Sequence, residues 1–134
     1  MKANELSCKD LMIGDWVKVK YPQKQVKVKE IKQSCIYTEG NGYEYSEIES
    51  IPLTPEILEK NGFIRDMFYG EWQFDLDTFP FNFPFSVVQR ENNSWYLGRE
   101  EIGIAHNREI IDISYVHELQ HALRLCGIEK TIEL

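Results

Sequence analysis

The amino-acid sequence predicts an α+β protein built mostly of short antiparallel strands, with one short helix in the middle of the chain and one amphipathic helix near its end. Three observations predict this class. Apolar and polar residues alternate along several short segments, as they do in half-buried strands. Residues that favour turns separate these segments. Helical periodicity is confined to two places, of which the segment 114–126 is the longer.

The first predicted strand shows strict alternation. Val17, Val19 and Tyr21 share one face of the strand and are expected to point inward. Lys18 and Lys20 occupy the other face, which is expected to contact solvent. The pattern is typical of a strand with one buried face.

A second strand is predicted after a turn at residues 22–24. Its valines, Val26 and Val28, are expected to point inward. Its lysines, Lys27 and Lys29, are expected to point outward. The first two strands therefore predict a hairpin with a lysine-rich outer face.

Two more strands, at residues 34–39 and 43–48, flank Gly40-Asn41-Gly42, which suits the positive φ angles of a tight hairpin turn. Several short strands within about 50 residues predict a small SH3-like curled β-meander or barrel. We expect this lobe to cover residues 1–53 and an α+β lobe to cover residues 54–134, the two forming one compact unit.

A short helix is predicted at the start of the second lobe. The Thr54 hydroxyl suits the helix cap, Pro55 suits the first helical position, and Glu56 suits the positive helix end. Asn61-Gly62 is expected to end this helix. Further strands are predicted at residues 72–77, 85–90 and 95–99, the last two forming a hairpin over residues 91–94.

The last predicted element is an amphipathic helix over residues 114–126, ended by Gly127. Its apolar stripe comprises Tyr115, Val116, Leu119, Ala122, Leu123 and Cys126. His117 and His121 project to nearly the opposite side of the helix, which they share with Gln120 and Arg124. We expect this side to be solvated.

The same helix contains His117-Glu118-Leu119-Gln120-His121, the His-Glu-x-x-His pattern of zinc metallopeptidases. The spacing allows both histidines to hold Zn²⁺ from one helix face, with Glu118 as the general base for the zinc-bound water. A third ligand is required, and His106 and Asp112 are the candidates if the fold brings them close.

Other features of the sequence weigh against a zinc site. Arg124 lies on the same side of the helix, and a fixed cation opposes the binding of a metal ion. The residues after His121 contain no histidine, and the extension typical of metzincins is absent. We therefore expect no cofactor, and we keep a small zinc hydrolase as the alternative.

Charge is unevenly distributed along the chain. The 15 basic and 22 acidic side chains give a net charge of −7, which argues against a surface that binds polyanions everywhere. Between Trp16 and Lys32, however, Glu30 is the only acidic residue. A nucleic-acid contact is one interpretation of this patch, and a solvated outer sheet face is the other. Base stacking would require Trp16 or Tyr21 to point outward. The candidate contacts form a lysine ribbon of Lys18, Lys20, Lys27 and Lys29.

Phenylalanine recurs at every second position of residues 79–85, with two prolines between the rings. These rings either close the core or form an exposed patch that recruits a protein partner. In the second case Phe81 and Phe83 are the candidate contacts.

No apolar run approaches the roughly 18 residues that a membrane span requires. The N-terminus lacks the basic and apolar stretches of a secretory signal. The three cysteines show no Cys-x-x-Cys spacing, so a disulfide scaffold is not expected. We expect a cytoplasmic protein without membrane contact.

Three stretches are similar to a group of short uncharacterised proteins common in Bacteroidales genomes and their prophages. They read Leu-Met-Ile-Gly-Asp-Trp-Val at 11–17, Ile-Pro-Leu-Thr-Pro-Glu-Ile-Leu at 51–58, followed by Asn-Gly-Phe at 61–63, and Tyr-Val-His-Glu-Leu-Gln-His at 115–121. In that group the helix typically reads Val-His-Gln-Leu-Gln-Asn, so this chain departs from it at Glu118 and His121. The resemblance implies a mobile-element context and no catalytic residue.

These features together predict a non-catalytic binding module of mobile-element origin, whose partner is either a protein or a nucleic acid.

Overall fold

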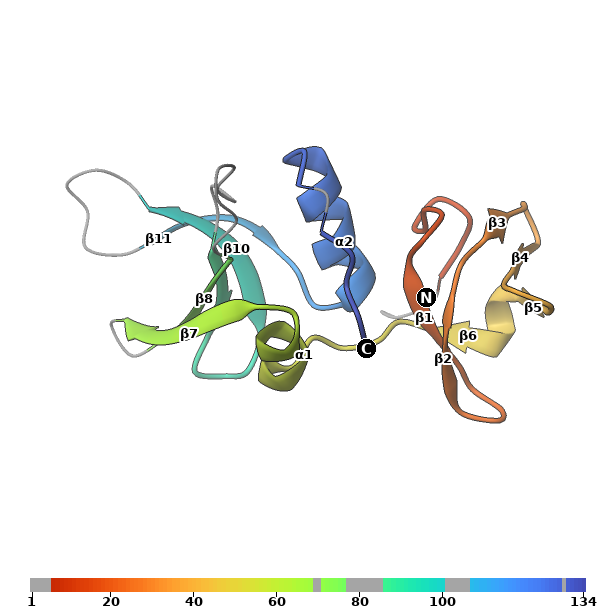
Figure 1. Ribbon diagram of the computed structural model, residues 1–134, viewed down its shortest axis with the longest axis horizontal. Helices are drawn as coiled ribbons and strands as arrows, with labels where there is room; N and C mark the ends of the chain where they lie inside the picture. The colour runs from red at the N-terminus through yellow and green to blue at the C-terminus, as the bar shows by residue number, and fades with distance from the viewer. Residues whose placement is uncertain (1–5, 69–70, 77–85, 101–106, 129) are drawn as a thin grey trace. The chain divides into compact units, whose positions relative to one another are not determined.

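The computed structural model describes residues 6–68, 71–76, 86–100, 107–128 and 130–134. The protein is mostly β, with two short α-helices and three antiparallel sheets, none of which closes into a barrel within the described ranges (Figure 1). The chain divides into two units. The N-terminal unit comprises Met1–Pro52 with Tyr115–His121, and the C-terminal unit comprises Leu53–Ser114 with Ala122–Leu134.

The N-terminal unit contains two small sheets, in the orders β2-β1-β6 and β3-β4-β5. A 3₁₀ turn, η1, leads into the last strand, which returns to pair with β1. As expected, the turn between β4 and β5 places Gly40 at a φ of 93°, which only glycine adopts readily. The elements are β1 (Trp16–Val19), β2 (Lys24–Lys27), β3 (Glu30–Ile31), β4 (Cys35–Tyr37), β5 (Gly42–Glu44), η1 (Tyr45–Glu47) and β6 (Ile48–Glu49).

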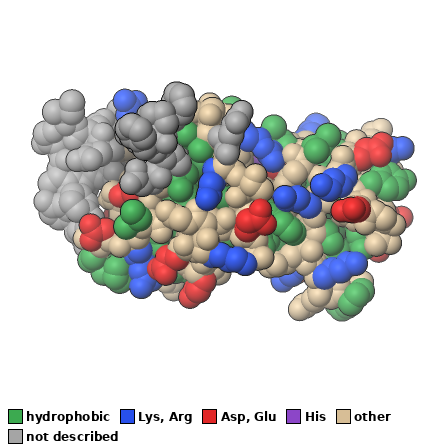
Figure 2. All heavy atoms as spheres, in the orientation of Figure 1, with side chains coloured by type: hydrophobic (Ala, Val, Ile, Leu, Met, Phe, Trp, Pro, Cys, Tyr) green, Lys and Arg blue, Asp and Glu red, His purple; other side chains and the backbone are tan. Residues whose placement is uncertain are grey.

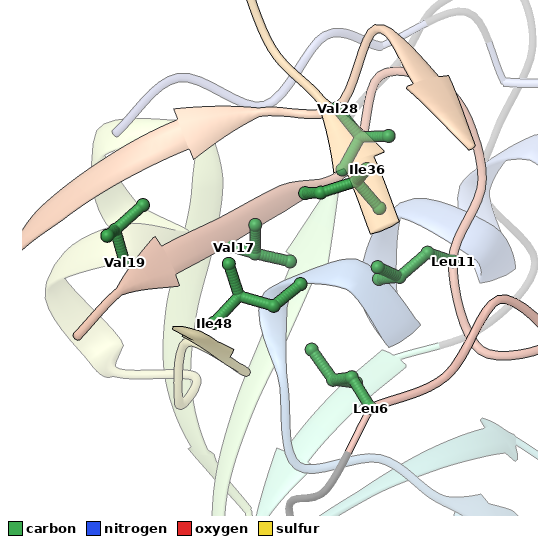
Figure 3. Close-up of a cluster of buried hydrophobic side chains, with 7 residues drawn as sticks. All are labelled: Leu6, Leu11, Val17, Val19, Val28, Ile36 and Ile48. Atoms are coloured by element: carbon green, nitrogen blue, oxygen red, sulfur yellow. The ribbon is translucent and has the colours of Figure 1, made fainter. Parts of the chain in front are cut away.

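The core of the N-terminal unit consists of aliphatic side chains. Figure 3 shows Val17 and Ile48 pointing towards one another, with Val28 beside Ile36. The inward direction predicted for Val17 and Val19 is confirmed, but the inward direction predicted for Tyr21 is wrong, because this side chain is 89% exposed. Strand β1 ends at Val19, so the alternation does not extend to Tyr21, which lies in the following turn. The buried cluster is Leu6, Leu11, Val17, Val19, Val28, Ile36 and Ile48.

The C-terminal unit contains one five-stranded antiparallel sheet in the order β11-β10-β9-β8-β7. Its helix begins as predicted, because the Thr54 hydroxyl accepts a hydrogen bond from the Ile57 backbone N–H at 3.2 Å. Phe74 is fully buried and lies 5.5 Å from Trp95, centroid to centroid. The elements are α1 (Pro55–Lys60), β7 (Phe63–Phe68), β8 (Glu71–Leu76), β9 (Ser86–Gln89), β10 (Trp95–Glu100) and β11 (Asn107–Asp112).

The predicted C-terminal helix is present as α2 (Val116–Leu125). Its first part, through His121, belongs to the N-terminal unit, and its remainder belongs to the C-terminal unit. Within the described ranges, no helix has the length and apolar character needed to cross a bilayer.

Candidate functional site

The His-Glu-x-x-His segment lies in the N-terminal unit, where the solvated surroundings expected for it are not found. His117 is only 5% exposed and Gln120 only 7%. The His117 ring stacks on Tyr115 with centroids 5.8 Å apart and meets the His121 ring edge-on at 5.6 Å. The expectation of a solvated histidine face is therefore wrong. The reason is that this face supplies polar partners to a buried loop, a role that apolar side chains could not fill.

That loop is the segment Gly14–Trp16, and Gln120 binds it at both ends. The Gln120 carboxamide oxygen accepts a hydrogen bond from the Trp16 backbone N–H at 2.9 Å. Its NH₂ group donates to the Gly14 carbonyl at 3.0 Å. The amide thus satisfies one donor and one acceptor of the backbone, as a neighbouring strand would.

Asp15, in the same loop, is fully buried and contacts the second histidine of the motif. Its Oδ2 lies 2.6 Å from His121 Nε2 and also accepts a hydrogen bond from the Met12 backbone N–H at 2.7 Å. A buried carboxylate requires such partners to offset its lost hydration. The pair therefore holds the loop against the start of α2.

Glu118 is engaged at the beginning of the helix. Its Oε1 accepts a hydrogen bond from the Tyr115 backbone N–H at 3.1 Å. This contact is the reach-back of a capping residue at the third helical position. The geometry therefore favours a structural role for Glu118 over the general-base role considered from the sequence.

Among the described residues, no three His, Cys, Asp or Glu side chains are grouped so that they could hold a metal ion. Of the two candidate third ligands, His106 lies outside the described residues, and Asp112 forms an ion pair with Arg90 at 2.8 Å. Burial lowers the pKa of His117 from its ordinary value of 6.5, and its Nδ1 has no hydrogen-bond partner among the described residues. His117 is therefore a neutral, buried imidazole at pH 7.

The lysine ribbon is not a single uniform row. Lys18 forms an ion pair with Glu49 at 3.0 Å. Trp16 pairs across the strands with Lys27, whose Nζ lies 5.3 Å from the centre of the indole ring. Lys20 follows the end of β1. Of the four ribbon lysines, Lys18 has an acidic partner, and the other three form no ion pair with a residue that the structure describes.

A groove of about 340 Å³ lies beside β2 in the N-terminal unit. Lys27 and Lys29 of the ribbon border it, whereas Lys18 and Lys20 do not. Several lysine side chains lie close together over this unit in Figure 2. The full lining is Trp16, Lys24, Gln25, Val26, Lys27, Lys29, Thr38, Glu39 and Asn41.

The sequence pattern predicts only part of this groove. It places Lys24 in the turn before the second strand and Thr38 in a strand, and it predicts the turn at Gly40-Asn41-Gly42 without indicating that Asn41 borders a groove. No local sequence signal places this turn beside β2, because the approach depends on how the strands curl. Phe81 and Phe83, the other predicted contacts, lie outside the described residues.

Comparisons of the chain with protein-family models, with curated proteins and with solved structures gave no match.

Proposed function

We propose that the protein is a non-catalytic binding module whose N-terminal unit binds nucleic acid. One observation carries this proposal. Lys24, Lys27 and Lys29 border one groove, and within the described part of the chain none of them forms an ion pair. Lysines without carboxylate partners can neutralise phosphate groups, and each neutralised phosphate releases counterions that were condensed on the nucleic acid, which favours binding.

The net charge of −7 does not oppose this local attraction. Charges separated by more than about 10 Å are largely screened at moderate ionic strength, so a bound strand responds mainly to nearby lysines. Glu39 is the one acidic side chain in the groove lining, and it faces three lysines there. The groove is therefore the part of the N-terminal unit where we propose that phosphate groups bind.

The arrangement of the N-terminal unit supports an SH3-like fold as part of the proposal. Strand β1 pairs with both β2 and β6, and a 3₁₀ turn precedes β6. Small curled β-units of this kind bind nucleic acids through one exposed face and its loops. The resemblance to prophage-type proteins adds a mobile-element setting, and we propose the cytoplasm as the location.

The test is the binding of fluorescently labelled DNA, followed by anisotropy over a salt series that starts at about 50 mM. We expect weak binding that disappears as salt rises. The double variant Lys27→Glu, Lys29→Glu should lose at least about tenfold in affinity, because it removes two phosphate contacts and adds two repulsive charges.

A matched variant distinguishes the effect of the lysines' position in the groove from the effect of the net charge. Lys9 and Lys130 are exposed and do not border the groove. The double variant Lys9→Glu, Lys130→Glu changes the net charge equally, and we expect its affinity to remain within about twofold. Equal losses in both double variants, or no DNA binding by the unaltered protein, would overturn the proposal and leave a protein as the partner to seek.

A further inference from the structure

We infer that the bound nucleic acid is single-stranded and that one of its bases stacks on Trp16 in the groove; this inference rests on the proposed function. Trp16 is then the side chain that distinguishes a single strand from a duplex. The observations that carry it are the aromatic side chains beside the lysines, the size of the groove and the way in which Trp16 is held.

Lysines of the N-terminal unit lie over aromatic rings. Besides Lys27 over Trp16, Lys24 lies 5.9 Å from the centre of the Tyr43 ring. Lys32 lies 5.4 Å from the centre of the Tyr37 ring. Of these three rings Trp16 borders the groove, so it is the ring that a base can reach while the neighbouring lysines attract phosphates.

Trp16 and Tyr37 are not part of the core of this unit. Trp16 is half-buried, and Tyr37 is 40% exposed. The buried cluster is aliphatic, and the half-buried Tyr43 packs against it, whereas Trp16 borders the groove. An aromatic surface costs free energy while it remains in water, and stacking against a base removes part of that cost.

The groove suits a single strand better than a duplex. Its volume of about 340 Å³ is at the lower end of the range of small-ligand pockets, so it suits a group as small as a nucleotide and not a double helix. The bases of a duplex already stack on one another, and their flat faces are closed to a tryptophan. In a single strand these faces are open.

Polar side chains around the groove complement an open base. Gln25 and Asn41 border it and carry both donors and acceptors, as base edges do. Glu39 also borders the groove and repels phosphates, so we place the phosphates along Lys24, Lys27 and Lys29. This arrangement orients a strand without requiring a particular sequence.

Trp16 is held before any ligand arrives. Its backbone N–H donates to Gln120, and its register opposite Lys27 is set by the pairing of β1 with β2. These contacts fix the backbone at Trp16, so the strand need not be ordered on binding and less conformational entropy is lost. The polar contacts of α2 with this loop therefore support the binding surface as well as the fold.

The experiment compares a thymidine oligonucleotide of about ten residues with a DNA duplex of equal length, at equal salt, by fluorescence anisotropy. We expect the single strand to bind at least about tenfold more tightly. Trp16→Leu should reduce single-strand affinity about tenfold and leave duplex affinity unchanged, because only the stacking contact is lost. Trp16→Phe, which keeps an aromatic ring, should retain most of the affinity.

Trp72→Leu is the matched control. Trp72 is also half-buried beneath a cation, with the Arg65 guanidinium 4.4 Å from its ring centre, but it does not border the groove. We expect its single-strand affinity to stay within about twofold of the unaltered protein. Circular dichroism of each variant verifies that it remains folded.

The possible failures are distinguishable. Equal or tighter duplex binding, together with unchanged single-strand affinity in Trp16→Leu, would overturn the inference while lysine-dependent DNA binding continued to support the proposed function. If neither DNA form bound, the proposed function itself would fail.

Discussion

The two units use their aromatic residues in opposite ways. In the C-terminal unit, Phe63, Phe74, Trp95 and Tyr96 are buried. In the described part of the N-terminal unit no phenylalanine, tyrosine or tryptophan side chain is buried, and Tyr21 and Tyr37 are among its exposed large side chains. Aromatic rings contribute strongly to stability when buried, so the rings of the N-terminal unit contribute less to its stability and are available for the binding that we propose.

The cations that lie over aromatic rings also differ between the two units, because they differ in whether a carboxylate pairs with them. In the C-terminal unit, Arg65 contacts Glu59 at 3.2 Å, and Arg90 contacts both Glu109 and Asp112. Carboxylates thus neutralise these arginines. In the N-terminal unit, Lys32 lies over Tyr37 and 3.9 Å from Glu30, whereas Lys24 and Lys27 lie over rings and form no ion pair with any described residue. A cation–aromatic pair therefore marks a candidate binding site only where no carboxylate already pairs with the cation.

The largest expected effect tests the contrast between buried and surface rings. Phe74→Ala should lower the free energy of unfolding by about 3–5 kcal/mol, because it leaves a cavity in the sheet of the C-terminal unit. Trp16→Leu should cost about 1 kcal/mol or less, because its ring is half-buried. Denaturation in urea measures both. Similar losses for the two variants would contradict the division of roles between the units.

A smaller effect is expected from the polar contacts that complete the N-terminal unit. Gln120→Leu should lower the free energy of unfolding by about 1–3 kcal/mol, since the Trp16 N–H and the Gly14 carbonyl lose their partner. Gln23→Leu, at an exposed turn position, is the matched control and should change stability by about 0.5 kcal/mol or less. A Gln120→Leu variant as stable as this control would show that the amide is dispensable.

The smallest expected change in the free energy of unfolding comes from His117. It is absent at neutral pH and develops in mild acid. The pKa of His117 is lowered by burial, while Glu118, Asp15 and Asp10 oppose this shift and His121 reinforces it. The unfolded chain, in which the pKa of this histidine is near 6.5, therefore takes up a proton before the folded protein does. Stability should fall as the pH decreases from about 6.5 towards the folded-state pKa.

His117→Phe removes this titration and keeps a ring beside Tyr115. Its unfolding free energy should therefore fall less steeply than that of the unaltered protein over the same pH interval. Thermal or urea unfolding between pH 7 and about pH 5 provides the comparison. Parallel pH profiles for the two proteins would exclude His117 as the source of the acid sensitivity.

Much of the fold could be predicted because its causes are local. The alternation of Val17 and Val19 with lysines predicts β1, and Thr54-Pro55 predicts the start of α1. The amphipathic pattern predicts α2. The candidate groove was predicted only in part, since Lys27 and Lys29 belong to the lysine-rich hairpin whereas Thr38 and Asn41 reach the groove from another turn.

The sequence by itself determined where strands, turns and helices form, because a β-strand, a cap or a glycine turn depends on residues only a few positions apart. Only the tertiary structure decided the surroundings of the His-Glu-x-x-His segment. Gln120 and His121 contact Gly14, Asp15 and Trp16 across separations of 104 and 106 residues. Helical periodicity identifies the apolar side of a helix, but a polar side is buried wherever a distant loop brings backbone groups and a carboxylate that need hydrogen bonds.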